Sequence, residues 1–194
     1  MDNMKLFEKM IAKLNANPKT IVFTEGTDAR ILEAASNLLK DNFLKPILVG
    51  TVDDVKKAAD QFGFDITGAE IIDPANFERF DEMVALFCEI RKKKGVTPEE
   101  ARAVLSHGNY FGTMLVKMGV ADSLLGGATY STADTVRPAL QVIKTKPGNK
   151  VVSSCFIMVR PTADGENEML AMGDCAINLD PTDDELVEIG LESA

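Results

Sequence analysis

The chain has 194 residues, of which 45% are apolar and 26% charged, so it is long enough to bury the core of a globular domain. Its net charge of -9 argues against a nucleic-acid partner, because a phosphate backbone repels an acidic surface. The single histidine and the spacing of Cys88, Cys155 and Cys175 do not fit a zinc site, and we expect no metal. Three cysteines, an odd number, fit a reducing compartment best.

The amino-terminal segment, residues 1–13, mixes charges of both signs at helical spacing. It lacks the apolar stretch of a signal peptide, and no later segment reaches the length that would span a membrane. These features predict a cytoplasmic protein that has no membrane partner.

Short apolar runs then alternate with longer helical patterns over the first three quarters of the chain. Buried strands are expected at residues 20–24, 45–49, 70–72 and 122–125. The expected helices cover residues 28–40, 52–62, 77–93, 98–105, 110–117 and about 131–143. Apolar strands that are joined by helices form parallel sheets covered on both faces. The pattern therefore predicts a three-layer α/β/α fold with a mainly parallel sheet.

The character of the sequence changes at the turn-rich residues 145–149, which we interpret as a hinge between two lobes. Residues 151–159 and 169–177 are predicted to be the strands of a hairpin, joined by a polar connection at residues 162–168. A last helix is expected to begin near Asp180, since an acidic first turn follows a capping residue there.

An apolar hairpin with one helix cannot cover both of its faces. We therefore expect a first α/β lobe at residues 1–148 and the start of a second α/β lobe at residues 149–194. The second lobe is expected to be truncated or to pack on another body.

The first candidate site is residues 25–30, where a strand leads into a helix and where open α/β sheets bind ligands. Gly26 permits the turn, and Asp28 can cap the helix. Arg30 stands in the first helical turn, where a cation opposes the helix dipole. A bound anion would resolve this conflict, and so would an ion pair with Glu33 or another surface carboxylate.

The second candidate site is residues 126–138, after the last strand of the first lobe. Its glycines free backbone N–H groups, Ser131 and Thr132 offer hydroxyl groups, and Arg137 can supply a planar, two-pronged donor to phosphate. The same residues can instead form a helix cap, with Ser131 or Thr132 at the cap and Asp134 in the first turn. The segment lacks the order of a P-loop or of a dinucleotide-binding motif.

Two other features are interpreted more simply. The basic residues 91–94 end a predicted helix, where cations complement the dipole, although anion binding stays open as the alternative. Cys155 and Cys175 lie within apolar predicted strands, and we expect both to be buried thiols rather than nucleophiles.

Residues 131–141, followed by residues 143–148, closely resemble the signature of the phosphate acetyltransferase family. The resemblance spans nearly the whole chain, and its other parts are residues 25–30, 48–50, 91–95 and 173–178. Phosphate butyryltransferases share the architecture but are less similar at residues 131–135, so the resemblance favours acetyl over butyryl transfer.

The resemblance implies an enzyme of two α/β lobes with the active site between them, assembled as a homodimer. Its substrates would be acetyl-CoA and phosphate, or in reverse acetyl phosphate and coenzyme A, with no covalently bound cofactor. In the implied mechanism an Asp base deprotonates the coenzyme A thiol, which attacks the acetyl phosphate carbonyl within a ternary complex. Arginines would hold the phosphate and stabilise the developing negative charge.

Carried onto this sequence, the resemblance assigns Arg137 to phosphate, with Ser131 and Thr132 beside it. It assigns Arg91 to substrate binding and Arg30 to coenzyme A. The base belongs to a part of the family pattern that follows Ala194, so the resemblance identifies the chain as the amino-terminal portion of the family pattern.

A chain without that base is expected to bind phosphate or acetyl phosphate weakly and to turn over poorly. The alternative readings are a phosphate butyryltransferase, or a non-catalytic module that binds phosphorylated metabolites or a partner.

Overall fold

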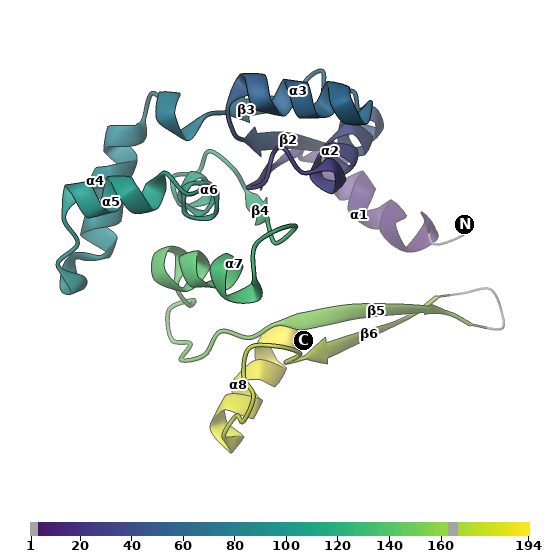
Figure 1. The fold of residues 1–194 in the computed structure, drawn as a ribbon. Helices are drawn as coiled ribbons and strands as arrows, with labels where there is room; N and C mark the ends of the chain where they lie inside the picture. The colour runs from purple at the N-terminus through teal and green to yellow at the C-terminus, as the bar shows by residue number, and fades with distance from the viewer. Residues whose placement is uncertain (1–3, 163–166) are drawn as a thin grey trace. The chain divides into compact units, whose positions relative to one another are not determined.

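The computed structural model describes residues 4–162 and 167–194 (Figure 1). The chain forms two compact units, one of residues 10–143 and one of residues 144–194 with residues 1–9. The lobe boundary expected after residue 148 stays a prediction. The first helix, α1 (Met4–Ala16), precedes the sheet.

The larger unit contains a four-stranded sheet in which every pairing is parallel. Its strands are β1 (Lys19–Phe23), β2 (Leu44–Val49), β3 (Glu70–Ile72) and β4 (Ser123–Leu125). The strand order is β3-β2-β1-β4, so β1 is flanked by β2 on one side and by β4 on the other. The predicted α/β class with a mainly parallel sheet is therefore confirmed.

Helices connect and cover these strands. They are α2 (Ala29–Asp41), α3 (Val52–Phe62), α4 (Phe80–Ile90), α5 (Pro98–Leu105), α6 (Gly108–Lys117) and α7 (Thr132–Pro138). Short 3-10 turns lie at Pro74–Asn76 and Lys92–Lys94. Thr51 caps α3 by accepting a hydrogen bond from the backbone of Asp54, and Thr97 forms a capping box with Glu100 at α5.

The core is divided by the sheet, because successive side chains of a strand point to opposite faces. Val22 and Ile47 belong to the cluster that contains residues of α4, α5 and α6. Their neighbours Phe23 and Leu48 belong to the cluster that contains residues of α2 and α3. Each face of the sheet thus has its own apolar layer, as the three-layer prediction requires.

The helix that the sequence predicts over residues 131–143 changes its geometry midway. The α-helical turns of α7 end at Pro138, and Ala139–Ile143 continue as a π-helix. Proline has no N–H group, and its ring clashes with the carbonyl group four residues earlier, so regular α-helical bonding cannot pass through it.

Residues 144–194 of the smaller unit form an antiparallel hairpin and one helix. Its elements are β5 (Cys155–Pro161), β6 (Asn167–Gly173) and α8 (Asp183–Ser193). The hairpin and the final helix were predicted, but the strand bounds differ away from the hairpin turn. Strand β5 begins at residue 155 rather than 151, and β6 ends at residue 173 rather than 177. Part of the predicted connection, residues 163–166, lies outside the described residues.

Side chains explain why β5 starts later than the apolar run that begins at residue 151. The backbone N–H groups of Lys150 and Val151 donate to Glu188 Oε1, at 2.8 and 2.9 Å. The N–H group of Ser154 donates to Asp174 Oδ1 at 3.2 Å. These donors are bound to carboxylates, so they are not available to a neighbouring strand.

Asp174, directly after β6, ends that strand by gathering donors. Its carboxylate accepts hydrogen bonds from the hydroxyl group of Ser154 and from the backbone N–H groups of Ala176 at 3.1 Å and Asn178 at 2.8 Å. Burial opposes the charged form, but these hydrogen bonds outweigh it and hold the pKa of Asp174 far below its ordinary value. Asp174 therefore has a structural role in the described unit.

The hairpin exposes apolar side chains on both of its faces. The consecutive residues Phe156, Ile157 and Met158 are 59%, 58% and 49% exposed. The expected burial of Cys155 and Cys175 is wrong, since both are exposed. Cys155 belongs to this uncovered hairpin and Cys175 follows its second strand, so the described residues provide no layer to bury them.

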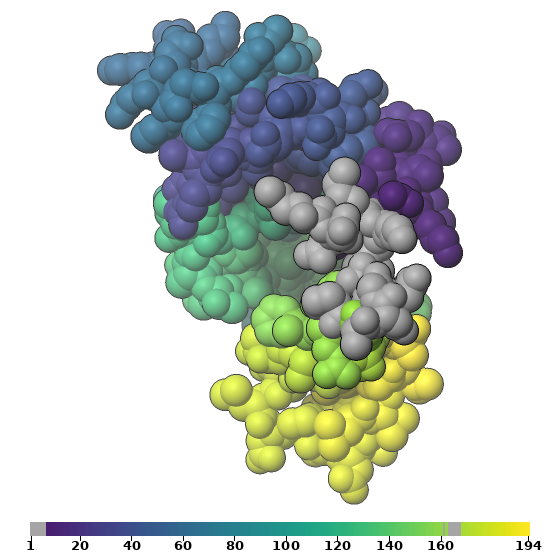
Figure 2. All heavy atoms as spheres, turned by 90° about the vertical axis from the view of Figure 1, so that its right-hand side faces the viewer, coloured from purple at the N-terminus to yellow at the C-terminus, as the bar shows by residue number. Residues whose placement is uncertain are grey.

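Helix α8 also carries exposed apolar side chains, on Leu186, Val187 and Leu191. Figure 2 shows the atoms of this last segment, in yellow, at the surface of the molecule. One residue of α8, Ile189, is buried, which identifies the side of the helix that faces apolar neighbours.

Among the helices that the structure describes, none combines the length and the apolar character needed to cross a bilayer.

Phe111 provides a test of the larger core. It is fully buried and contacts Phe77 edge-on at 5.4 Å between ring centroids and Phe80 at 6.5 Å. We predict that Phe111→Ala lowers the free energy of unfolding by about 3–5 kcal/mol, measured by urea denaturation, because it leaves a large cavity. The control Phe62→Ala, at a side chain that is 45% exposed, should cost less than about 1 kcal/mol. Equal losses in the two variants would contradict this description of the core.

Candidate functional site

The loops that follow the four parallel strands meet at the carboxyl ends of the strands, which we call the sheet edge. The chain moves from β1 outward to β2 and β3, and β4 returns to the other side of β1. The gap between β1 and β4 is thus the point where the strand order reverses, and open α/β sheets bind ligands at such points. Glu25 follows β1 there, and Gly126 follows β4.

Two cavities open at this edge, of about 590 and 480 Å³. They share lining residues from the ends of β1 and β2 and from the loop after β4, namely Thr24, Val49, Gly50, Thr51 and Tyr130. The larger cavity is also lined by Arg102 of α5, and the smaller one by Glu25 and Asp28. These volumes suit a small metabolite or one part of a larger one.

The carboxylate of Glu25 binds the loop after β4 through four successive residues. Its Oε2 atom accepts hydrogen bonds from the backbone N–H groups of Gly127 at 2.9 Å and Ala128 at 3.0 Å. Its Oε1 atom accepts from the N–H group of Thr129, from the Thr129 hydroxyl group at 2.8 Å, and from the N–H group of Tyr130 at 3.0 Å. One side chain therefore fixes a loop that is more than a hundred residues away in sequence.

The glycine at position 127 allows the N–H groups to converge. Its φ angle of 102° lies in a region that other residues rarely adopt. Gly126 meets a different demand, because a Cβ atom there would lie 2.7 Å from the hydroxyl oxygen of the buried residue Thr24. The Gly126-Gly127 pair of the sequence thus permits both the close approach to β1 and the turn around Glu25.

Hydrogen bonding also sets the charge of Glu25. The side chain is buried, and burial by itself would raise its pKa. The donors of Thr129, Ala128 and Tyr130 outweigh this effect and bring the pKa of Glu25 below its ordinary value. Glu25 is therefore ionised at neutral pH, and its negative charge is stabilised by backbone N–H dipoles.

Arg30 contacts the same loop from α2. Asp28 caps this helix, as predicted, and accepts from the Arg30 backbone N–H group at 3.0 Å. The Arg30 guanidinium group donates to both oxygens of Asp28, at 2.9 and 2.8 Å, and to the backbone carbonyl oxygen of Ala128 at 2.5 Å. The unfavourable cation in the first turn is thus balanced by a carboxylate, Asp28 rather than Glu33. The guanidinium group of Arg30 still faces solvent, since the Arg30 side chain is 67% exposed.

Ser131, Thr132 and Arg137 follow the loop directly. Ser131 caps α7, as the second reading of this segment predicted, by accepting from the Asp134 N–H group at 3.2 Å. Arg137 lies 3.7 Å from Asp134, a loose ion pair, and its side chain is 57% exposed. Ser131 caps α7, Thr132 is its first residue and Arg137 lies in its last turn, so the structure places the three on one short helix.

The remaining candidate, Arg91, lies on another helix, where it ends α4 as its C-cap. None of the five candidates, Arg30, Arg91, Ser131, Thr132 and Arg137, is among the described residues that line the two cavities at the sheet edge. Arg30 is close to the group, because it binds Ala128, three residues before Ser131. The predicted roles of Arg91 and Arg30 stay predictions.

Glu25 is the residue at this edge that sequence reasoning missed. The sequence suggested that the glycine loop offers N–H groups to phosphate, but Glu25 already accepts four of them. Ser131 already donates its hydroxyl proton to Asp134 Oδ2 at 2.7 Å, so the hydroxyl group of Thr132 and the guanidinium group of Arg137 are the donors that this segment can offer to a ligand. The sequence does carry a signal for such a contact. An acidic residue follows the inner strand β1, and a Gly-Gly loop follows the neighbouring strand β4.

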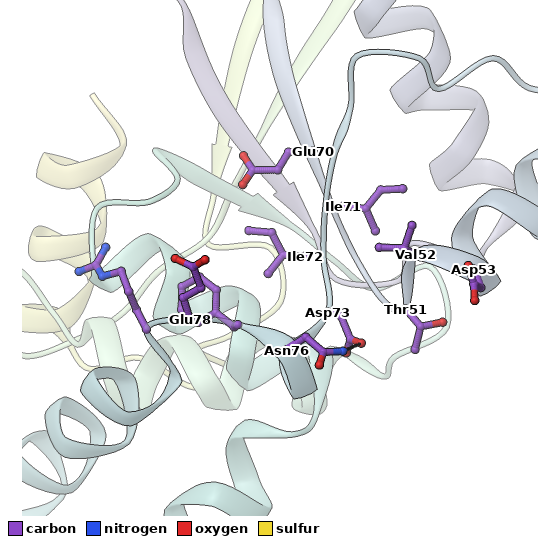
Figure 3. Close-up of a pocket in the computed structure, with 11 residues that line it drawn as sticks. Thr51, Val52, Asp53, Glu70, Ile71, Ile72, Asp73, Asn76 and Glu78 are labelled. Atoms are coloured by element: carbon purple, nitrogen blue, oxygen red, sulfur yellow. Dashed lines mark hydrogen bonds between the residues drawn. The ribbon is translucent and has the colours of Figure 1, made fainter.

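A third cavity, of about 490 Å³, lies beside the edge strand β3 (Figure 3). Among the described residues that line it are four carboxylates, on Asp53, Glu70, Asp73 and Glu78. Its arginine, Arg79, is paired with Glu82 at 2.7 Å. Figure 3 shows Glu70 on β3, Asp73 and Glu78 in the segment after it, and Asp53 at the start of α3. This acidic lining repels phosphate, so the cavity is a poor candidate for an anion site.

Comparison with known proteins gives a consistent result. A family model described as Phosphate acetyl/butaryl transferase matches residues 5–194. The phosphate acetyltransferase of Thermoanaerobacterium thermosaccharolyticum is 44% identical over 192 residues, which cover 98% of this chain and 58% of that protein. The phosphate acetyltransferase of Bacillus subtilis is 47% identical over 189 residues, which cover 97% of this chain and 57% of that protein.

Solved structures agree with these relatives. The EutD phosphotransacetylase from Staphylococcus aureus matches with a TM-score of 0.89 and 42% identity, over 98% of this chain and 56% of that chain. A phosphotransacetylase from Streptococcus pyogenes matches with a TM-score of 0.89 and 44% identity, over 98% and 57%. The chain thus spans somewhat more than half the length of these relatives.

The lowered pKa of Glu25 predicts a pH dependence. The ionised carboxylate stabilises the fold above its ordinary pKa of 4.5, and this contribution is lost as the pH falls through the lower, folded value. Between pH 7 and pH 3, measured by urea denaturation, the wild type should therefore lose more stability than Glu25→Gln, which has no carboxylate to protonate. Glu33→Gln, the same change at an exposed position of α2, should retain the wild-type slope. Parallel curves for the wild type and Glu25→Gln would rule out this coupling.

Proposed function

Because the chain belongs to the phosphate acetyl/butaryl transferase family, we propose that it supplies phosphate-binding residues of a phosphate acetyltransferase. The proposed reaction is reversible transfer of an acetyl group between acetyl phosphate and coenzyme A. Curated relatives that bear the name phosphate acetyltransferase support this choice. Acetyl is proposed over butyryl because the similarity is strong at residues 131–135.

The exposed guanidinium group of Arg137 is the observation that carries the proposal. It lies in the last turn of α7, whose start carries Ser131 and Thr132, and only the loose contact with Asp134 engages it among the described residues. An arginine in this state can present two parallel N–H donors to phosphate oxygens. The hydroxyl group of Thr132 can donate to a further oxygen of the same phosphate group.

These residues would act on the leaving group of the reaction. In the proposed direction, the coenzyme A thiolate attacks the carbonyl carbon of acetyl phosphate, a C–S bond forms, and the C–O bond to phosphate breaks. The phosphate departs with the electron pair of that bond. Donors that are already in place stabilise the charge that develops on its oxygens and on the carbonyl oxygen.

The proposal also covers the coenzyme A site, the base, the assembly and the location of the protein. We assign coenzyme A to the side of the loop where Arg30 lies, because the guanidinium group of Arg30 is exposed there. We also propose that an Asp of the family pattern, in the part that the resemblance places after residue 194, takes the thiol proton. A ternary complex without covalent cofactor, a homodimeric assembly and a cytoplasmic location complete the proposal.

Substitution of Arg137 tests the phosphate assignment. We predict that Arg137→Ala weakens binding of inorganic phosphate by about tenfold or more, measured by isothermal titration calorimetry, because it removes a charged two-pronged donor. Arg137→Lys should give an intermediate affinity, since it keeps the charge but loses the paired geometry.

The matched control is Arg79→Ala, which removes an exposed arginine that lines the acidic cavity beside β3. This variant should bind phosphate as the wild type does. If Arg137→Ala also binds phosphate with unchanged affinity, the proposed function loses the residue on which it depends.

A further inference from the structure

We propose that Glu25 is a positioning residue for the phosphate site, an inference that rests on the proposed function. The contact of its carboxylate with residues 127–130 would set the place of Ser131 and, through α7, of Arg137. Glu25 would thus govern phosphate affinity without contacting phosphate itself.

The hydrogen bonds leave little room for another role of this side chain. A carboxylate has about four lone-pair sites, and Glu25 accepts five hydrogen bonds from the loop. A group in this state has no free lone pair with which to accept a proton from a thiol. Its negative charge also makes it an unsuitable direct partner for a phosphate group.

The loop is held from two sides by one short segment of the chain. Glu25 accepts its N–H groups, while Arg30 donates to the carbonyl oxygen of Ala128 at 2.5 Å. Both side chains belong to the connection between β1 and α2. The direction of each peptide group in the loop is therefore set by the end of β1, the inner strand next to β4.

The position of this contact in the sequence links it to the phosphate donors. Tyr130, the last residue that donates to Glu25, immediately precedes Ser131, the cap of α7. A hydroxyl group on the next residue cannot keep its place if the Tyr130 peptide group turns. A displacement of about 1 Å in a binding group can change affinity or rate strongly. Release of the loop should therefore displace Arg137 as well and weaken phosphate binding.

The same geometry explains what happens when the carboxylate is removed. The N–H groups of Gly127 to Tyr130 would converge on an empty space, and successive backbone N–H groups of this kind bind small anions. A free carboxylate such as formate has the oxygens needed to replace the missing side chain. Rescue by formate would therefore identify the loop N–H groups as the means by which Glu25 acts.

Titration of inorganic phosphate into four variants of the chain tests the inference. Glu25→Gln places an amide N–H₂ group among N–H donors, and we expect about tenfold or greater weakening of phosphate binding in a variant that is folded by circular dichroism. Glu25→Ala should show a similar loss, and millimolar formate should restore affinity in a saturable manner. Glu33→Gln should bind as the wild type does. Arg137→Ala should lose affinity, and formate should not restore it.

Glu25→Asp keeps the test decisive if the other two Glu25 variants do not fold. It retains the charge, but its carboxylate is one methylene group further from the loop, so phosphate should bind more weakly than to the wild type. Wild-type affinity in a folded Glu25→Gln or Glu25→Asp variant would overturn the inference, and so would a loss in Glu25→Ala that formate does not reverse.

The outcomes also separate this inference from the proposed function. Loss of phosphate binding in Arg137→Ala, with none in the Glu25 variants, would overturn the role of Glu25 alone. A wild-type chain that binds no phosphate at millimolar concentration would overturn the proposed function and the role of Glu25 together.

Discussion

The contact between the Glu25 carboxylate and the backbone of residues 127–130 is the interaction on which the proposed site depends. It joins the loop after β1 to the loop after β4, which are the two loops on either side of the point where the strand order reverses. A buried carboxylate is unfavourable unless donors surround it. Here the donors are backbone groups, which would themselves be unfavourable if they lost their partner. Each side of the contact therefore requires the other.

This arrangement also suits the proposed binding of phosphate by an acidic chain. The net charge of -9 opposes phosphate at long range, so favourable charge must be concentrated locally. The charge of Glu25 is stabilised by backbone dipoles, and Asp28 is paired with Arg30. Arg137 is left with a weak partner and an exposed guanidinium group. The carboxylates at this edge are thus engaged within the protein, whereas the acidic cavity beside β3 keeps several of its carboxylates exposed to a ligand.

The sequence predicts the regular elements well because hydrophobic periodicity is local. Helix α3 and strand β3 have the predicted bounds, and the Asp28 cap is where it was expected. The hairpin strands were predicted too long, because the donors at their outer ends bind Glu188 and Asp174, which no periodic pattern reveals. For the same reason the role of Glu25 was missed. Its partners lie 102 to 105 residues away, and only the fold brings them together.

The exchange behaviour of four backbone amides tests the central claim most directly. In the wild type, the N–H groups of Gly127, Ala128, Thr129 and Tyr130 should exchange slowly with solvent in two-dimensional NMR spectra, because each donates to Glu25. All four should exchange faster together in Glu25→Gln, while amides of the central strand β1 keep their protection. Rapid exchange of these four amides in the wild type, or unchanged exchange in Glu25→Gln, would contradict the account.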